Sequence, residues 1–474
     1  MTFFMTFVVT SFFLFVFVTL KIFWICRRRA AREDFPDCQQ GQKTLQGYIL
    51  SLTIFRRETL NKPHFSKSYS RYAMILLILV NLLNYIDRQV LFAMFPLIKD
   101  DLSLSDTALG FLGSAFMISY ICTAPFFGWF GDRFSRVHLA AGGVAAWSLA
   151  TAMAGFSTGY RTLIAARAAV GIGEASFGTV SPGLVSDFFP KEERGRVLSR
   201  FYVAIPVGSA IGYLLGGILG KIYGWHSAFF IVGLPGMILA LMLFFLKEPQ
   251  RGGESQDTDE ETETVSVDRS YRSLARNHSF LMNTLAMTAM TFAMGGLAQW
   301  FPSFLHRAHS LDIAEGNMLF GGVTVVAGIA GTMAGGWLGD YWQKRKKGGY
   351  LVVSGAGFFI GAPIAMFAML APSPFWCMTA TFFAEFFLFL NTGPLNTVII
   401  NVTKPEIRAM AFAVNIFFIH ALGDAISPSI IGWFSDAWGL RTALLLTPLA
   451  MMAAGVFCMI CTRHIAADMT EAGQ

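Results

Sequence analysis

Long apolar runs alternate with short polar connections along most of this chain. From Tyr72 onward each run is about 20 residues long, the length of helix that crosses the apolar part of a bilayer. The runs are expected at residues 72–96, 108–131, 137–156, 162–186, 198–220, 226–246, 279–305, 316–339, 350–370, 375–400, 409–433 and 441–462. Because soluble cores do not contain apolar runs so long and so closely spaced, the pattern predicts an all-α membrane protein with twelve transmembrane helices.

The second half of the chain repeats motifs of the first half. Gly128–Asp132 after the second run is echoed by Gly336–Asp340 after the eighth, and Pro190–Gly195 after the fourth run is echoed by Pro405–Ala409 after the tenth. Such duplication is common in secondary transporters. It predicts two pseudo-symmetric six-helix bundles, at residues 72–246 and 279–462. The acidic, aperiodic residues 247–278 are expected to form a cytoplasmic linker, and residues 463–474 a cytoplasmic tail.

Residues 1–71 do not fit the twelve-helix plan. They contain a Phe-rich hydrophobic segment at residues 2–26, followed by three consecutive arginines, Arg27 to Arg29. The segment lacks a basic start and a small-residue cleavage site, which disfavours an ordinary secretory signal. An extra N-terminal membrane helix, an uncleaved anchor and sequence added by an upstream start codon remain as alternatives.

Composition supports the membrane interpretation. The 474 residues are 54% hydrophobic and 14% charged, whereas soluble domains carry about 25% charged residues. The net charge of +6 does not indicate a nucleic-acid partner, because the basic residues lie in loops and form no stripe with interleaved aromatic residues. Lys and Arg are concentrated in alternate loops, which places both ends of the twelve-helix unit in the cytoplasm. Short loops favour a bacterial inner membrane, with an organellar membrane as the alternative.

Two adjacent charges interrupt the first apolar run. The sequence from Asn84 to Arg88 lies about 18 Å from the cytoplasmic end of its helix, close to the membrane midplane. A charge at a helix centre costs about 2.5–3.5 kcal/mol on insertion scales, so Asp87 and Arg88 are expected to avoid lipid and to mark a substrate or proton path. The alternative is a local ion pair, which adjacent helical residues form poorly because their side chains point in different directions.

The fourth run carries a second pair of charges. Arg167 and Glu174 are seven residues apart and therefore share one helix face, separated by about 10 Å. Gly171 lies between them and leaves room for a ligand or a neighbouring helix. If Arg167 pairs with Asp87 across the bundle, Glu174 is left as the carboxylate able to carry a proton. The alternative is a static buried network that fixes helix packing.

The apolar runs of the second half contain different chemistry. Glu385 lies among phenylalanines and is expected to face a cavity while the rings face lipid. His420 and Asp424 are one helical turn apart, as either a second titratable site or a packing contact. In the fifth run Gly208, Gly212 and Gly216 form a smooth stripe, interpreted first as a packing surface and second as a sliding surface.

Several of these motifs in combination resemble the major facilitator superfamily. The resemblance rests on three features: Gly128-x-x-x-Asp132-Arg133-x-x-Arg136, Arg167-x-x-x-Gly171-x-Gly173 and the duplicated twelve-helix plan. The loop departs from the family pattern at Ser135, where Gly is usual. Within the superfamily, the segments Asn84–Arg88, Gly171–Ala175 and Arg194–Arg196 look most like the Spinster-like transporters.

The resemblance implies proton-linked movement of a lysolipid or another anionic amphiphile by alternating access. Organic-anion and hexuronate symporters have a similar first-helix motif, so a small carboxylate is the alternative substrate. The candidate substrate- and proton-binding residues are Asn84, Tyr85, Asp87, Arg88, Arg167 and Glu174, with Glu385, His420 and Asp424 in the second half. The expected cytoplasmic gate comprises Asp132, Arg133, Arg136, Arg194, Asp340 and Arg408, with Asp132, Arg133 and Arg136 latching against the start of the eleventh run near Arg408.

Other functional classes are disfavoured. The sequence contains no nucleophile–base pair, metal-ligand cluster or nucleotide-binding loop, so neither an enzyme nor a protein with a metal or cofactor is expected. Cys458 and Cys461 form a C-x-x-C within a membrane run and are interpreted as apolar filler. A monomeric transporter whose partners are its substrate, protons and the bilayer is expected. A non-transporting receptor or scaffold is the alternative from another class.

Overall fold

The computed structural model describes residues 65–190, 193–249, 273–404 and 407–472, and in these ranges the regular secondary structure is entirely helical. The predicted hydrophobic segment at residues 2–26 lies outside the described residues. The first bundle comprises α3 (Lys67–Ala93), α4 (Phe95–Leu102), α5 (Asp106–Arg133), α6 (Arg136–Ala154), α7 (Tyr160–Asp187), α8 (Arg194–Tyr202) and α9 (Ala204–Phe244). Several helices begin at a side-chain cap: Ser66 accepts a hydrogen bond from Tyr69 N, and Ser105 accepts one from Ala108 N.

The second bundle has the same succession of membrane helices, but more of its helices are broken into shorter segments. It comprises α11 (His278–His309), α12 (Ile313–Gln343), α13 (Gly349–Leu370), α14 (Pro374–Phe389), α15 (Thr392–Val402), α16 (Arg408–Ile419), the π-helical turn η2 (His420–Asp424), α17 (Ser427–Trp438), α18 (Leu440–Leu444), α19 (Leu446–Cys461) and α20 (Ile465–Glu471). The eleventh predicted span is therefore α16, η2 and α17 in sequence. A π-helical turn inside a helix frequently occurs at a functional position.

Eleven helical segments of the described chain are long and apolar enough to cross a membrane. One of them, Arg194–Phe244, is 51 residues long and holds two crossings. Gly224 separates the two within α9, with φ 78° and ψ 161°, a conformation that glycine adopts without steric cost. The prediction of twelve membrane helices in two bundles is thus confirmed. The predicted tail contains the short helix α20, whose Ile465 and Met469 are buried.

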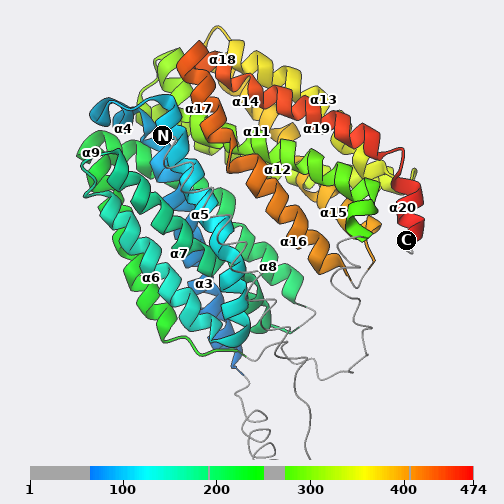
Figure 1. Ribbon diagram of the computed structural model, residues 1–474, viewed down its shortest axis with the longest axis horizontal. Coiled ribbons are helices and arrows are strands. Elements are labelled where there is room, and N and C mark those ends of the chain that lie inside the picture. The colour runs from blue at the N-terminus through cyan, green and yellow to red at the C-terminus, as the bar shows by residue number, and fades with distance from the viewer. Residues whose placement is uncertain (1–64, 191–192, 250–272, 405–406, 473–474) are drawn as a thin grey trace, which may run out of the picture. The chain divides into compact units, whose positions relative to one another are not determined.

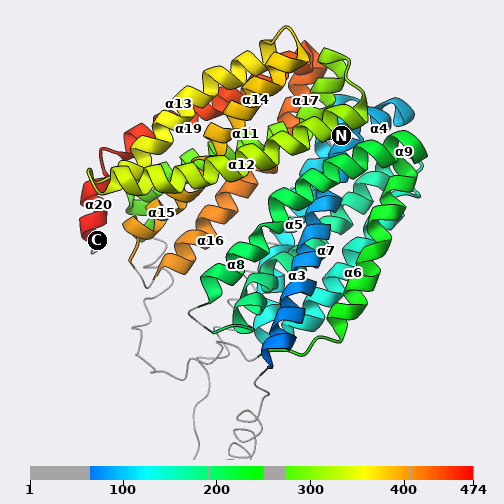
Figure 2. The same ribbon diagram turned by 180° about the vertical axis from the view of Figure 1, so that it is seen from behind.

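The bundles meet at one of their two ends. Both views show α4 and α17 where the bundles approach each other, and α8 and α16 where they diverge (Figure 1, Figure 2). We call the end where the bundles meet the α4 end; it includes the start of α5 and the finish of α17. We call the end where they diverge the α8 end; it includes the finish of α5 and the start of α16. Across the bundles α5 packs against α17, and α9 packs against α12.

The glycine stripe of α9 packs against α3. A Cβ at Gly208 would lie 2.7 Å from Leu82 O, and one at Gly212 would lie 2.7 Å from Ile86 O. Such contacts are too close for any larger residue, so the stripe permits the two backbones to touch. The interpretation as a packing surface is confirmed, whereas sliding along it stays a prediction. The contact fixes the helix that carries Asn84–Arg88.

Candidate functional site

Arg88 and Glu174 form the shortest ion pair near the predicted membrane midplane. Arg88 Nε on α3 donates to Glu174 Oε2 on α7 at 2.6 Å. The Glu174 side chain is fully buried, whereas 18% of the Arg88 side chain is exposed. The sequence did not predict this partner for Glu174: α3 and α7 face each other so that Glu174 meets Arg88, which sequence spacing on α7 alone does not reveal.

A second, looser pair lies beside the first. Arg167 Nη1 approaches Asp87 Oδ1 to 3.8 Å, which confirms the expected contact as an ion pair longer than a hydrogen bond. Thr151 on α6 donates its hydroxyl to the other oxygen of Asp87. The Arg167 side chain is fully buried, and none of its three guanidinium nitrogens has a hydrogen-bond partner among the described residues. Because buried charged donors are costly when unsatisfied, this pair is poised to accept another partner.

Aromatic rings surround the two arginines. The Arg88 guanidinium lies 5.0 Å from the ring centroids of Tyr85 and Phe116 and 5.4 Å from that of Tyr120. Arg167 lies 5.2 Å from the same Phe116 ring. Such stacking holds a cation without neutralising it. Phe116 and Tyr120 of α5 were not predicted from the sequence, since they differ in no visible way from the other aromatic residues of their span.

Asn84 and Gly171, which the sequence also singled out, lie beside these charges. Asn84 is buried on α3 and interacts with Glu174. Gly171 lies against α5, because a Cβ there would meet Phe116 O and Ser119 Cβ. Of the two alternatives for Gly171, approach of a neighbouring helix is the one observed. We call Asp87, Arg88, Arg167 and Glu174 the four-charge cluster.

In the second bundle two predicted groups lie on different helices. Glu385 on α14 accepts a hydrogen bond from Thr324 Oγ1 on α12 at 3.1 Å and is buried, while its Oε2 has no partner among the described residues. His420 Nδ1 lies 3.0 Å from both carboxylate oxygens of Asp424 within η2. Asp424 is close enough to Tyr85 to interact with it electrostatically. Asp424 therefore lies on the side of the second bundle that faces Tyr85.

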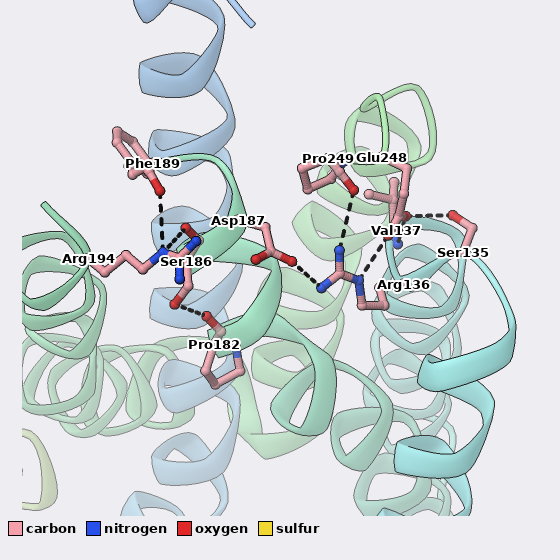
Figure 3. Close-up of polar contacts among 10 residues, drawn as sticks. All are labelled: Ser135, Arg136, Val137, Pro182, Ser186, Asp187, Phe189, Arg194, Glu248 and Pro249. Carbon is pink, nitrogen blue, oxygen red and sulfur yellow. Dashed lines mark hydrogen bonds and ion pairs between the residues drawn. The ribbon is translucent and has the colours of Figure 1, made fainter. Parts of the chain in front are cut away.

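The predicted gate residue Arg136 pairs inside the first bundle. Its Nη1 donates to Asp187 Oδ2 at 2.6 Å and its Nε donates to Glu248 Oε1 at 3.0 Å (Figure 3). Its Nη2 also donates to Pro249 O at 3.4 Å. Among the described residues Arg136 thus contacts α7 and residues 248–249 at the start of the predicted linker, and not the region of Arg408. Asp187 and Glu248 lack any spacing relation to Arg136 that would have predicted this.

Ser135, which stands where the family pattern usually has Gly, also contacts Glu248. Ser135 caps α6 with extended backbone angles, φ −63° and ψ 119°, and donates its hydroxyl to Glu248 Oε2 at 2.8 Å. Val137 N donates to the same oxygen at 2.9 Å. Burial raises the pKa of Glu248, but the hydrogen bonds from Val137 N, Ser135 and Arg136 outweigh it, so its pKa lies below the ordinary value.

The other gate residues make local contacts at the α8 end. Arg133 donates to Trp129 O at 3.2 Å and stacks 4.0 Å from the centroid of the Trp129 ring. Arg194 Nε donates to Ser186 O at 3.1 Å and to Phe189 O at 3.4 Å (Figure 3). Asp340 accepts from Tyr350 Oη at 2.6 Å, and Arg408 Nε donates to Thr403 O at 3.3 Å. Asp132 lies in the last turn of α5.

Sequence reasoning missed an ionic cluster at the α4 end. Asp106 at the start of α5 accepts from Arg307 Nη1 of α11 at 2.7 Å, from Lys99 Nζ and from Ser435 Oγ. A cavity of about 440 Å³ adjoins it, apart from the four-charge cluster; its lining includes Asp106, Phe304, Arg307, Ser435 and Arg441. Asp436 contacts the same end of α5. Each of these residues stands at a helix end, where charges are common, so no sequence signal distinguished them.

Sequence comparisons with known proteins agree with one another on the family of this chain. The sequence profile of the Major Facilitator Superfamily matches residues 77–428. Protein spinster of Drosophila melanogaster is 33% identical over 376 residues, which are 77% of this chain and 62% of that protein, so the chain spans less than two thirds of that relative. Protein spinster homolog 3 of Danio rerio is 32% identical over 447 residues, 86% of this chain and 89% of that protein.

Solved structures show the same fold. A bacterial homolog of the human lysosomal transporter Spinster, in an inward-facing and unoccupied conformation, superposes with a TM-score of 0.78 at 23% identity, covering 85% of this chain and 99% of that one. A D-xylose–proton symporter superposes with a TM-score of 0.65 at 14% identity, covering 83% and 97%.

Proposed function

This chain belongs to the major facilitator superfamily as a multi-pass membrane transporter of the Spinster type, and we propose that it carries an anionic amphiphile, such as a lysolipid, coupled to protons by alternating access. The family consists of transporters, so the expectation that the chain is not an enzyme is confirmed. The observation that carries the proposal is the Arg88–Glu174 pair. It joins a partly exposed cation to a buried carboxylate at 2.6 Å.

Competition at Arg88 supplies the coupling. The Arg88 guanidinium cannot pair fully with both Glu174 and an anionic headgroup, because its forked donors bind one planar acceptor best. A proton on Glu174 removes the competing charge and frees Arg88 for the headgroup. Arg167 meanwhile balances the charge of Asp87 at 3.8 Å. Proton and headgroup therefore bind together and move in the same direction.

The surroundings of Arg88 favour an amphiphile over a small carboxylate. Tyr85, Phe116 and Tyr120 present rings around the cation. Aromatic surface stabilises an acyl chain by removing it from water, whereas a small hydrophilic acid gains little from it. Hexuronates and other small carboxylates remain the second candidate substrates and are part of the test.

We propose that the α8 end faces the cytoplasm, since the basic loop residues such as Arg136, Arg194 and Arg408 lie there. The structure then represents the state in which the bundles meet on the far side. One chain contains both halves of the site, which supports a monomer as the transporting unit. Placement in a bacterial inner membrane rests on loop length and stays a prediction.

The test is transport by proteoliposomes under an imposed pH gradient, with a panel of lysolipids and small organic acids. We expect lysolipid flux that rises with the proton gradient in the wild type. Glu174→Gln is expected to keep substrate exchange and lose stimulation by the gradient, because a neutral amide cannot release a proton. Glu315→Gln, an exposed carboxylate of α12, is the matched control and should behave as wild type.

Three outcomes would contradict the proposal. If Glu174→Gln responds to the pH gradient like the wild type, Glu174 does not carry the proton. If only small carboxylates are transported, the amphiphile assignment is wrong and the second candidate replaces it. Flux of neither class in wild-type protein that is folded would favour the receptor or scaffold alternative.

A further inference from the structure

Asp436 joins the two bundles through the N-terminus of α5. Its Oδ1 accepts a hydrogen bond from Asp106 N at 2.8 Å. Its Oδ2 accepts from Thr107 N at 2.9 Å and from Thr107 Oγ1 at 2.6 Å. One carboxylate of the second bundle thus satisfies two backbone N–H groups in the first turn of a first-bundle helix, groups that have no partner within their own helix.

The position of Asp436 on its own helix is unfavourable. It lies in the last turn of α17 (Ser427–Trp438), where the helix dipole repels negative charge. The start of α5 supplies the opposite dipole and compensates this repulsion. Asp436 therefore loses both its hydrogen bonds and its electrostatic compensation when the bundles separate at the α4 end.

The two helices are also shaped for this contact. A Cβ at Gly110 of α5 would meet Pro428 O, and a Cβ at Gly432 of α17 would meet Asp106 O. Glycine on both sides lets the backbones approach closely beside the carboxylate. Ser114 Oγ and Ser429 Oγ lie 2.7 Å apart one to two turns further along the same interface.

We propose that Asp436 is the lock of the α4 end, a carboxylate that holds the bundles together there by capping α5 and that must release α5 before the site opens on that side. The proposal rests on alternating access in the proposed function. Asp436 lies in the last turn of α17 and caps the first turn of α5, so the contact joins the end of one helix to the start of the other.

The test measures how often the α4 end is closed. Ser114→Cys and Ser429→Cys are introduced together in a chain whose six native cysteines are replaced, and disulfide formation is timed under mild oxidation. We expect Asp436→Asn to slow cross-linking about tenfold, since it removes the charge and one acceptor. Thr107→Val, which removes one hydroxyl donor and keeps the side-chain shape, is expected to slow it about threefold.

Asp468→Asn is the matched control. Asp468 accepts a hydrogen bond from Ser279 N at the start of α11, so it caps a helix within the second bundle only. We expect its cross-linking rate to equal that of the reference chain. If Asp436→Asn and Thr107→Val also cross-link at the reference rate, Asp436 is not a lock. Thr107→Val keeps the test valid if Asp436→Asn does not fold.

Transport by the cross-linked reference chain separates the two proposals. We expect cross-linking to stop transport and reduction of the disulfide to restore it. Undiminished transport by fully cross-linked protein would overturn alternating access and, with it, the need for the lock to release. Cross-linking rates that do not change in the variants would overturn the lock alone.

Discussion

Replacing Gly212 by alanine tests whether the contact of α9 with α3 positions the four-charge cluster. The added Cβ would lie 2.7 Å from Ile86 O and 2.8 Å from the Cβ of Gln89. Carbon–oxygen contacts are ordinarily about 3.3–3.6 Å, so the helices must separate by roughly half an ångström or more. Overpacking of this kind costs about 1–3 kcal/mol of folding free energy.

The separation of the helices is expected to affect transport, because Ile86 directly precedes Asp87 and Arg88. A displaced α3 lengthens the Arg88–Glu174 contact of 2.6 Å, so we expect Gly212→Ala to lower both the melting temperature and the proton-driven flux. The control is Gly322→Ala on α12, where a Cβ would meet nothing within 4 Å. There alanine is expected to be neutral or to stabilise the helix by up to about 1 kcal/mol.

The assay is thermal unfolding of purified protein in detergent, followed by flux in proteoliposomes. The expected order of melting temperatures places Gly212→Ala below the wild type and Gly322→Ala at or above it. Equal melting temperatures for the two alanine variants would refute the close-contact argument. A destabilised Gly212→Ala with unchanged flux would separate helix packing from the placement of the cluster.

Three further outcomes are expected. The pKa of Glu248 lies below its ordinary value. Its contribution to stability should therefore be present above the unfolded pKa of about 4.3 and be lost as the pH falls through the lower folded pKa. The melting temperatures of wild type and Glu248→Gln should differ at pH 7 and converge in acid. Thr151→Val removes the hydroxyl that donates to Asp87 and should lower the free energy of unfolding by about 1–3 kcal/mol, whereas Thr151→Ser should restore it. Lys221→Ala breaks the 2.8 Å pair with Asp312, but both side chains are largely exposed, so an unchanged melting temperature is expected and a clear loss would contradict the solvent-screening argument.

Much of the fold could be predicted from the sequence. The interpretation of twelve apolar runs is confirmed, including the break near Gly224 that separates two crossings. The length of an apolar run is a local property, fixed by the rise per residue and the thickness of the bilayer. Small extramembrane elements were less visible: α20 has seven residues, too few for a periodic pattern to stand out.

The candidate site was only partly predictable. The sequence identified Asp87, Arg88, Arg167 and Glu174, because charges in apolar runs are costly and therefore informative. It did not identify Thr151, which donates to Asp87, or the rings of Phe116 and Tyr120 near Arg88. Hydroxyl and aromatic residues are ordinary in membrane helices, so their role depends on which neighbours they meet.

The sequence by itself determined that this is a membrane transporter fold of two related halves with four charges near mid-membrane. Only the tertiary structure decided how the charges pair: Glu174 meets Arg88, Arg136 pairs with Asp187 and Glu248, and Asp436 caps α5. The physical reason is that helix burial depends on local sequence, whereas ion pairing depends on residues far apart in the sequence. Burial follows from each segment's own composition, whereas a pair requires two helix faces to meet, and this orientation is set by the packing of the whole bundle.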